Sequence, residues 1–265
     1  MTGLTQSLTN FIVNPTWGDG ESGALGIANV GFIDTVATMM AGSREPVAQI
    51  VLAHARSTCA DQSSNMSGGV PVPFGAISLP PPLAAYVNGV TAHALDYDDV
   101  ALSGHTSTVL VPAILAEGHR LGISGLEALR AYVVGYEVWA ELVAREPDPY
   151  HLKGWHPTGV FGTVAAAAAV AYLNKLSEAD TRQALSIAAS MASGLVANFG
   201  TMTKPLHAGR AAACGIDAVR LSVLGLTSAP DVFEHPAGFL NAISPSGLAD
   251  RGRATDGLGQ TLRIL

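Results

Sequence analysis

The sequence predicts an all-α fold, and three observations support this prediction. Apolar residues recur at helical spacing along most of the chain, helix-ending signals such as "LGISG" and "LGLTSAP" follow several of these segments, and an alanine-rich run reads "VAAAAAVAYL". Alanine has the highest helix propensity, and its small side chain lets neighbouring helices approach closely. A chain of 265 residues can bury a substantial core, because a domain of this size hides roughly 70 to 75% of its unfolded surface.

The expected helices follow one another along the chain. Their periodicity places them at residues 25–40, 47–54, 83–95, 109–121, 126–143, 160–173, 179–199 and 205–224. Residues 67–82 are too rich in proline for a helix, and we expect an extended connector or a short pair of strands there.

We expect one helical domain at residues 1–241 and a linker-like tail at residues 242–265. The tail is polar and glycine-rich, and it then stops at the apolar sequence "LRIL". An apolar end after such a stretch is typical of a boundary inside a longer architecture.

The composition limits the classes of partner. Hydrophobic residues make up 48% of the chain and charged residues 13%, about half the usual charged share. We therefore expect an oligomer, a missing domain, or both. The formal net charge is -7 and the sequence contains no run of Lys and Arg, so we expect no nucleic-acid partner.

The sequence also predicts a soluble, cytoplasmic protein. Its two cysteines lack CxxC spacing, which supports neither a disulfide framework nor a zinc site and fits a reducing compartment. The apolar run at residues 160–173 is shorter than the ~20 residues of a membrane span, and the N-terminus has no basic region before its apolar residues. We expect no membrane partner.

Three basic residues each stand before an expected helix start. Lys204 and His156 precede prolines, which are favoured at the first helical position, and His105 precedes "TST", three competent N-cap residues. A helix N-terminus carries unpaired N–H groups and about half a positive charge, so a basic side chain there has the unfavourable sign. Three such starts together predict a site for anions, and carboxylates are the natural ligands.

Each basic residue could instead cap or pack locally, and one further histidine shares this ambiguity. His207 lies three residues after Lys204, so it can face the same pocket or serve as a hydrogen-bonded core histidine. We assign substrate binding to His207, Thr203 and Ser107.

The segment "HALDYDDV" supplies the acidic partner of the site. On a helix, His93 and Asp96 share a face while Asp98 points elsewhere. We therefore choose Asp96 as the carboxylate that keeps the basic groups charged or correctly oriented. We expect one of Asp98 and Asp99 to cap the following helix. Oxygen ligands are present here, but no second carboxylate cluster completes a magnesium site, and we predict no metal.

These residues belong to motifs that resemble the MmgE/PrpD family, which includes 2-methylcitrate dehydratases, cis-aconitate decarboxylases and iminodisuccinate epimerases. The motifs occur in the family's order over most of the chain: "FIDTVATMMAG", "AAYVNGVTAHALDYDDV", "GHTSTVLVPAILA", "GYEVWAELV", "WHPTGVFGTVAAAAA" and "TKPLHAGRAA". The spacing between "DYDD" and "GHTS" is slightly shorter than in the decarboxylase members.

The resemblance implies a helical domain that carries most of the active site, a smaller α/β lid domain after it, and a homodimer. It also implies catalysis without a metal or an organic cofactor. The chain stops about where such proteins enter the lid domain, so we expect the lid to be lacking. Matched motif by motif, the family's active-site positions fall on Asp96, His105, His156, Lys204 and His207.

We therefore expect a cofactor-independent acid–base enzyme that acts on a small di- or tricarboxylate, a lyase of the 2-methylcitrate dehydratase type. Lys204 binds and polarises a substrate carboxylate, and His156 is the general acid or base with His105 or His207 opposite it. The motifs equally allow cis-aconitate decarboxylation or iminodisuccinate epimerisation. An alternative of another class is a catalytically silent helical module for dimerisation or binding.

Overall fold

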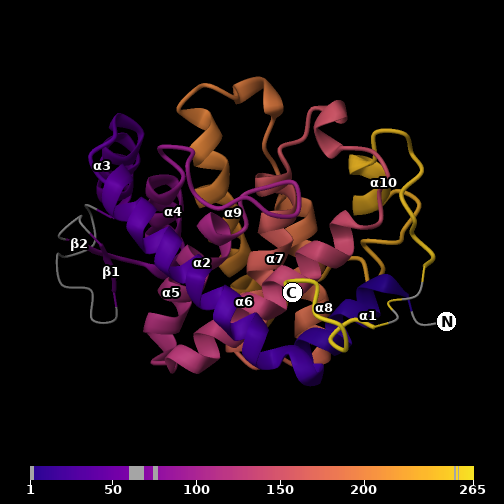
Figure 1. The fold of residues 1–265 in the computed structure, drawn as a ribbon. Coiled ribbons are helices and arrows are strands. Elements are labelled where there is room, and N and C mark those ends of the chain that lie inside the picture. The colour runs from indigo at the N-terminus through magenta and orange to yellow at the C-terminus, as the bar shows by residue number, and fades with distance from the viewer. Residues whose placement is uncertain (1–2, 60–68, 74–76, 254, 256) are drawn as a thin grey trace.

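The computed structural model describes residues 3–59, 69–73, 77–253, 255 and 257–265, and these residues form a helical assembly (Figure 1). The helices are α1 (Leu4–Val13), α2 (Glu21–Gly42), α3 (Pro46–Cys59), α4 (Pro81–Ala92), α5 (Ser107–Leu121), α6 (Gly125–Val143), α7 (Pro157–Leu173), α8 (Glu178–Met191), α9 (Thr203–Val223) and α10 (Phe239–Ile243). Three short 3-10 turns are η1 (Gly18–Gly20), η2 (Tyr150–Lys153) and η3 (Val196–Asn198). The prediction of an all-α fold is confirmed.

A small two-stranded sheet is the exception to the helical fold. Strands β1 (Val70–Val72) and β2 (Ile77–Leu79) pair antiparallel, and they lie on the opposite side of the molecule from the N-terminus and α10 (Figure 1). Of the two alternatives expected for the proline-rich sequence, an extended connector or a short pair of strands, the structure has the strand pair. The rest of that expectation, at residues 67–68 and 74–76, falls outside the described residues.

Helix α7 is the centre of the core because it is apolar on every face. Its alanine run is buried, and neighbouring helices approach its backbone closely. A Cβ added to Gly215 of α9 would lie 2.5 Å from the Cβ of Ala166. Likewise, α4 and α9 cross where a Cβ on Gly89 would lie 2.7 Å from the Cα of Gly209. The small residues thus set the distances at which these helices pack.

Two features of the helix pattern differ from the expectation. The helix expected at residues 179–199 ends at Met191, because the backbone is already extended at Ala192 (φ -60°, ψ 135°), and Gly194 follows with φ 122°. The chain after it is extended at Leu195, which pairs with Trp155 in a β-bridge. Helices α1 and α10, both amphipathic and short, were not predicted.

The C-terminal residues pack against α6. Leu262 and Ile264 are buried, the backbone N–H of Ile264 donates to Glu137, and Arg263 donates to Glu141 at 2.5 Å. The division at residue 241 stays a prediction, but the segment after it contributes side chains to the core.

Helix α2 packs through one face only. Ala28, Gly31 and Thr35 are buried on its inner face, whereas Val30 and Ile33 are exposed on its outer face. Residues 18–42 are long and apolar enough to cross a membrane by length and composition alone, with 33% of the apolar window buried inside the fold. Core helices of soluble proteins pass the same test. Glycine and threonine interrupt the apolar residues of this segment, so it does not form a continuous apolar run in the sequence.

Candidate active site

The loop between α4 and α5 builds one wall of the candidate site. It begins at His93, the C-cap of α4, and contains three non-glycine residues with positive φ: Asp96 at 56°, Leu102 at 52° and Ser103 at 62°. The two residues that flank the Leu102–Ser103 turn exchange backbone hydrogen bonds at 2.9 Å. A tight turn with two left-handed residues normally uses Asn-Gly or Gly-Gly, so the surrounding structure holds this loop in a strained shape.

The carboxylate of Asp98 lies buried between two histidines. His93 Nδ1 is 2.8 Å from one of its oxygens, and His105 Nδ1 is 2.7 Å from the other. Burial alone would raise the pKa of Asp98, but the hydrogen bonds from His105 and His93 outweigh burial and hold that pKa below its ordinary value. The carboxylate is therefore ionised, and both histidines donate to it.

This arrangement corrects two expectations about the acidic segment. Asp98 does not point away from His93, because the chain leaves the helix at His93 and the helical face rule no longer applies. Neither Asp98 nor Asp99 caps α5 through its side chain: the N-cap of that helix is Thr106, whose side chain makes no capping bond. The role of Asp98 was missed, although a buried His–Asp pair was available as a signal in "HALDYDD".

Asp96 and Lys204 form an ion pair at the solvent-facing edge of the site. The Lys204 ammonium donates to Asp96 Oδ1, and His105 Nε2 lies 3.5 Å from the same oxygen. The Asp96 side chain is 51% exposed, whereas those of Lys204 and His105 are 12% and 13% exposed. Lys204 Nζ also lies 5.1 Å from the ring centre of Phe199, within cation–π range.

The three expected helix starts are present with one shift in register. His156 is the N-cap of α7 and Pro157 is its first residue, as predicted. Helix α9 begins at Thr203, so Lys204 lies within its first turn and not before it. His105 lies two residues before Ser107, the first residue of α5.

His156 and His207 form a direct pair behind this edge. Their Nδ1 atoms are 3.0 Å apart, so one ring donates and the other accepts. Burial lowers the pKa of His156 to about 3, with the charge of His207 as a further cause, and burial also lowers the pKa of His207. His156 is therefore neutral at working pH. The prediction placed its pKa near neutrality because it did not include burial.

Histidine rings connect the wall formed by the α4–α5 loop with a second wall, formed by the first turns of α7 and α9. The ring centres of His93 and His105 are 4.2 Å apart, and those of His93 and His156 are 6.3 Å apart. The structure thus brings His105, His156, His207, Asp96 and Lys204 together, and adds His93.

A cavity of about 330 Å³ opens beside this cluster. Lys204, Asp96 and His93 line it, together with Glu45 from the start of α3 and the segment Gly200–Met202; the remaining lining residues are Pro46, Val47, Ala94, Leu95 and Pro205. Glu45 was not predicted, and nothing in its local sequence marks it. A cavity of this size fits a small polycarboxylate.

All three predicted substrate-binding residues, His207, Thr203 and Ser107, lie outside this cavity lining, and so do His105 and His156. Thr203 is half-buried, and its backbone N–H donates to Thr201 Oγ1 at 3.2 Å. Ser107 is fully buried; its hydroxyl donates to Asp99 and lies 2.7 Å from the hydroxyl of Tyr132. Substrate binding by Thr203 and Ser107 stays a prediction.

The acidic loop also contains a group with metal-compatible geometry. One atom each from His93, Asp96, Asp98 and His105 lies within 4.8 Å of the others. The Lys204 ammonium already binds Asp96, and Asp98 already accepts from both histidines. A cation could bind here only if it displaced these donors.

Comparison with known proteins gives these features a family. Residues 6–250 match the MmgE/PrpD N-terminal domain. The chain belongs to the MmgE/PrpD family. The match includes the helical segments and both walls of the site.

Relatives of this MmgE/PrpD chain include cis-aconitate decarboxylases. The chain is 41% identical to the Homo sapiens enzyme over 186 residues, 67% of this chain and 38% of that protein, and 39% identical to the Mus musculus enzyme over 167 residues, 61% and 34%. The cis-aconitate decarboxylase-like protein oryM of Aspergillus oryzae is 36% identical over 169 residues, 60% and 35%. The matches thus cover little more than a third of the length of these three relatives.

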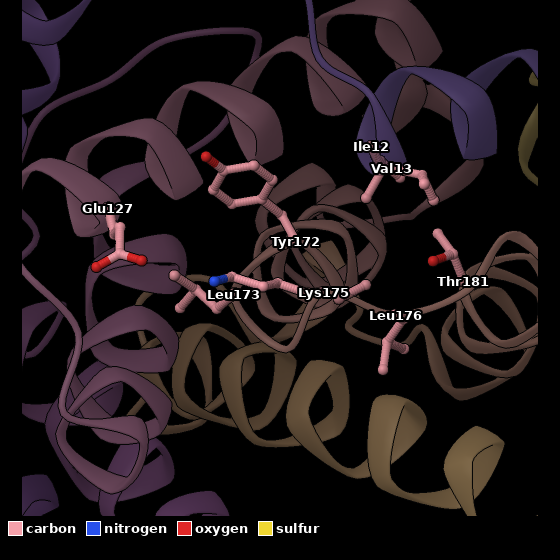
Figure 2. Close-up of a pocket in the computed structure, with 9 residues that line it drawn as sticks. Ile12, Val13, Glu127, Tyr172, Leu173, Lys175, Leu176 and Thr181 are labelled. Carbon is pink, nitrogen blue, oxygen red and sulfur yellow. The ribbon is translucent and has the colours of Figure 1, made fainter.

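A second cavity in the MmgE/PrpD chain lies elsewhere. Figure 2 shows it between α1, the end of α7 and the start of α8. Its volume is about 170 Å³. Glu127 and Lys175 bring opposite charges to its lining, beside Tyr172 and Thr181. It contains none of the predicted site residues.

Proposed function

We propose that this chain forms the helical part of a lyase that acts on a small di- or tricarboxylate by acid–base chemistry, with cis-aconitate as the favoured substrate. The observation that carries the proposal is the ion pair of Lys204 and Asp96 in a cavity, with His105 at the same carboxylate oxygen. Membership of the MmgE/PrpD family and the similarity to cis-aconitate decarboxylases support it.

Lys204 supplies the positive charge that a polycarboxylate needs. Its ammonium is held by Asp96, an exposed carboxylate that a substrate carboxylate can replace. At ~4 Å and an effective dielectric of ~20, one such ion pair contributes about 4 kcal/mol before desolvation is subtracted. The N-terminal N–H groups of α9 add partial positive charge at the same place.

The histidines move the proton. In a decarboxylation, the C–C bond to one carboxylate breaks, carbon dioxide leaves, and the electron pair stays on the substrate until a proton is added. His105 Nε2 lies beside the Lys204–Asp96 pair and can supply that proton from the charged ring, while His156 and His207 are close enough to pass a proton between them.

Dehydration of 2-methylcitrate, the reaction that the sequence put first, and epimerisation of iminodisuccinate also need groups that move a proton at a carbon beside a carboxylate. Their substrates also carry carboxylates for Lys204 to bind. The named relatives favour decarboxylation over these two reactions, because the three described above are cis-aconitate decarboxylases or proteins named as similar to them.

A product assay tests the proposal. The chain is incubated separately with cis-aconitate, 2-methylcitrate and iminodisuccinate, and products are identified by NMR and chiral chromatography. We expect turnover of cis-aconitate, with Lys204→Ala and His156→Ala inactive. Lys175→Ala, a lysine of the second cavity, is the matched control and should retain activity. Turnover of another substrate would replace the reaction, and turnover of none would favour the silent binding module.

Homodimer formation also remains a proposal, and the outer face of α2 is the first surface to examine. Val30, Ile33 and Met40 are exposed there at 64%, 63% and 57%. Sedimentation of the chain and of Ile33→Glu measures the association state: loss of a dimer in the variant would support this surface, and an unchanged dimer would exclude it.

A further inference from the structure

We propose that Asp98 and His93 are positioning residues that set the orientation and proton location of His105. The role in turnover rests on the proposed function, but the hydrogen bonding does not. The observation is a single buried carboxylate whose two oxygens accept from two different histidines, at 2.7 Å and 2.8 Å. Its side chain has no exposed surface.

The carboxylate determines which nitrogen of His105 carries a proton. An ionised carboxylate can only accept, so Nδ1 of His105 must be protonated whether the ring is neutral or charged. The opposite nitrogen, Nε2, then faces Asp96 at 3.5 Å on the side of the Lys204 ion pair. Asp98 thus reserves Nε2 of His105 for proton exchange beside the Lys204–Asp96 pair.

His93 explains why the carboxylate keeps this orientation. A carboxylate bound at one oxygen can rotate about its bond, whereas donors on both oxygens fix its plane. His93 supplies the second donor, and its ring lies 4.2 Å from that of His105, which limits movement of both rings. Its other nitrogen, Nε2, is buried and has no hydrogen-bond partner among the described residues. The bond from Nδ1 to Asp98 is therefore the one hydrogen bond that the described residues give this imidazole, and Asp96 Oδ1 lies farther from the same Nδ1, at 3.9 Å.

The neighbouring carboxylate provides a matched comparison. Asp99 is also largely buried, but it accepts from the hydroxyl of Ser107 and contacts neither histidine through a hydrogen bond in the described structure. Replacing either aspartate by asparagine removes one charge and keeps nearly the same volume. Asp98→Asn and Asp99→Asn therefore differ in whether the lost carboxylate binds imidazoles.

The first experiment measures histidine tautomers by nitrogen NMR in the whole chain with labelled histidine. In the wild type we expect protonated Nδ1 in both His93 and His105. In Asp98→Asn the amide can accept from one ring but must donate to the other, so one ring should change to the Nε2-protonated tautomer. Asp99→Asn should leave both Nδ1 protons in place. Unchanged tautomers in Asp98→Asn would overturn the proposal.

The second experiment measures kinetics with the substrate found for the chain. Asp98→Asn should lower kcat by about 10²–10⁴-fold, as expected when a histidine is held in the wrong tautomer, with KM changed less than about threefold. His93→Phe keeps a ring without a donor and should lower kcat by about 10–100-fold, whereas His93→Asn keeps an N–H near Nδ1 and should recover most of the loss. Equal activity of His93→Phe and His93→Asn would overturn the role of His93.

The two readouts separate this proposal from the proposed function. A tautomer change in Asp98→Asn without turnover by the wild type would support the positioning role and count against the lyase. Turnover by the wild type that Asp98→Asn leaves unchanged would support the lyase and overturn the positioning role.

Discussion

The two walls of the site are built in different ways. His156, Lys204 and His207 stand at the starts of α7 and α9, helices whose backbones pack tightly through alanine and glycine. Asp98 and His105 instead lie in the irregular loop between α4 and α5, which contains three non-glycine residues in left-handed conformations. Helix packing holds the first wall, whereas side-chain hydrogen bonds hold the second.

This difference separates two tasks. A helix start supplies positive charge wherever it points, so rigid helices are suited to place the charge that binds a carboxylate. Proton exchange needs a defined tautomer, and only a hydrogen-bond partner can define it. The loop provides that partner in Asp98. A change to one wall should therefore leave the geometry of the other wall intact.

The largest expected effect is on the charge of the helix wall. Lys204→Ala should lower kcat/KM by up to about 10³-fold, because it removes an ion pair with a substrate carboxylate worth about 4 kcal/mol before desolvation is subtracted. The free energy of unfolding should change by less than about 1 kcal/mol, because Asp96 is half exposed and water can solvate it. Steady-state kinetics and urea unfolding measure both quantities. A loss below tenfold would remove Lys204 from its assigned role.

The next effect is the pH dependence of stability from the buried histidine pair. The folded-state pKa of His156 is about 3, below its unfolded value of about 6.5. The contribution of His156 to the free energy of unfolding is therefore fully present above pH ~6.5. It is lost as the pH falls toward 3, by up to about 1.4 kcal/mol per pH unit. His93 and His207, whose pKa values burial also lowers, add slopes of the same sign.

Urea unfolding between about pH 7 and pH 5 measures this slope. His156→Asn should reduce it, since asparagine does not titrate. Asp98 on the loop wall does not contribute in this range, because its pKa lies below that of an ordinary aspartate and its stabilisation is lost only in stronger acid. An equal slope in wild type and His156→Asn would show that the buried pair is not neutral.

A smaller effect should follow from filling the close approach beside His156. A Cβ at Gly159 would collide with the carbonyl oxygen of Ser193 and lie 3.4 Å from the Cβ of His207. Gly159→Ala should lower the free energy of unfolding by about 1–3 kcal/mol, as overpacking does. Gly125→Ala, whose Cβ meets nothing within 4 Å, is the control and should be neutral or stabilising. Thermal and urea unfolding distinguish them; equal stability would mean that the helix wall is looser than its packing indicates.

The smallest expected effect is relief of loop strain. Ser103 is exposed with φ 62°, a conformation that glycine adopts without steric cost. Ser103→Gly should raise the free energy of unfolding by about 0.5 kcal/mol, after the greater flexibility of unfolded glycine offsets part of the gain. Ser103→Ala keeps the Cβ and should give no such gain. Stabilisation by alanine rather than glycine would locate the strain elsewhere.

The helical fold was readable from the sequence because its evidence is local. Apolar periodicity and alanine content identified α7, and "WHP" correctly placed His156 before its first residue. The expectation failed after Met191, where contacts distant in sequence hold the backbone: the carbonyl of Gly194 accepts from the backbone N–H of His156 at 3.1 Å, and Leu195 pairs with Trp155. The substrate-binding assignment of Ser107 followed its position at a helix start, but its hydroxyl binds Asp99 and Tyr132.

The sequence by itself determined the helices and the basic residues at their starts, since propensity, proline position and periodicity act over a few residues. Only the tertiary structure decided how those residues work together. Asp98 joins His93 to His105, His156 pairs with His207, and burial lowers the pKa of His156. Hydrogen bonds and desolvation depend on which groups the packed helices bring together and remove from water, and no local pattern contains that information.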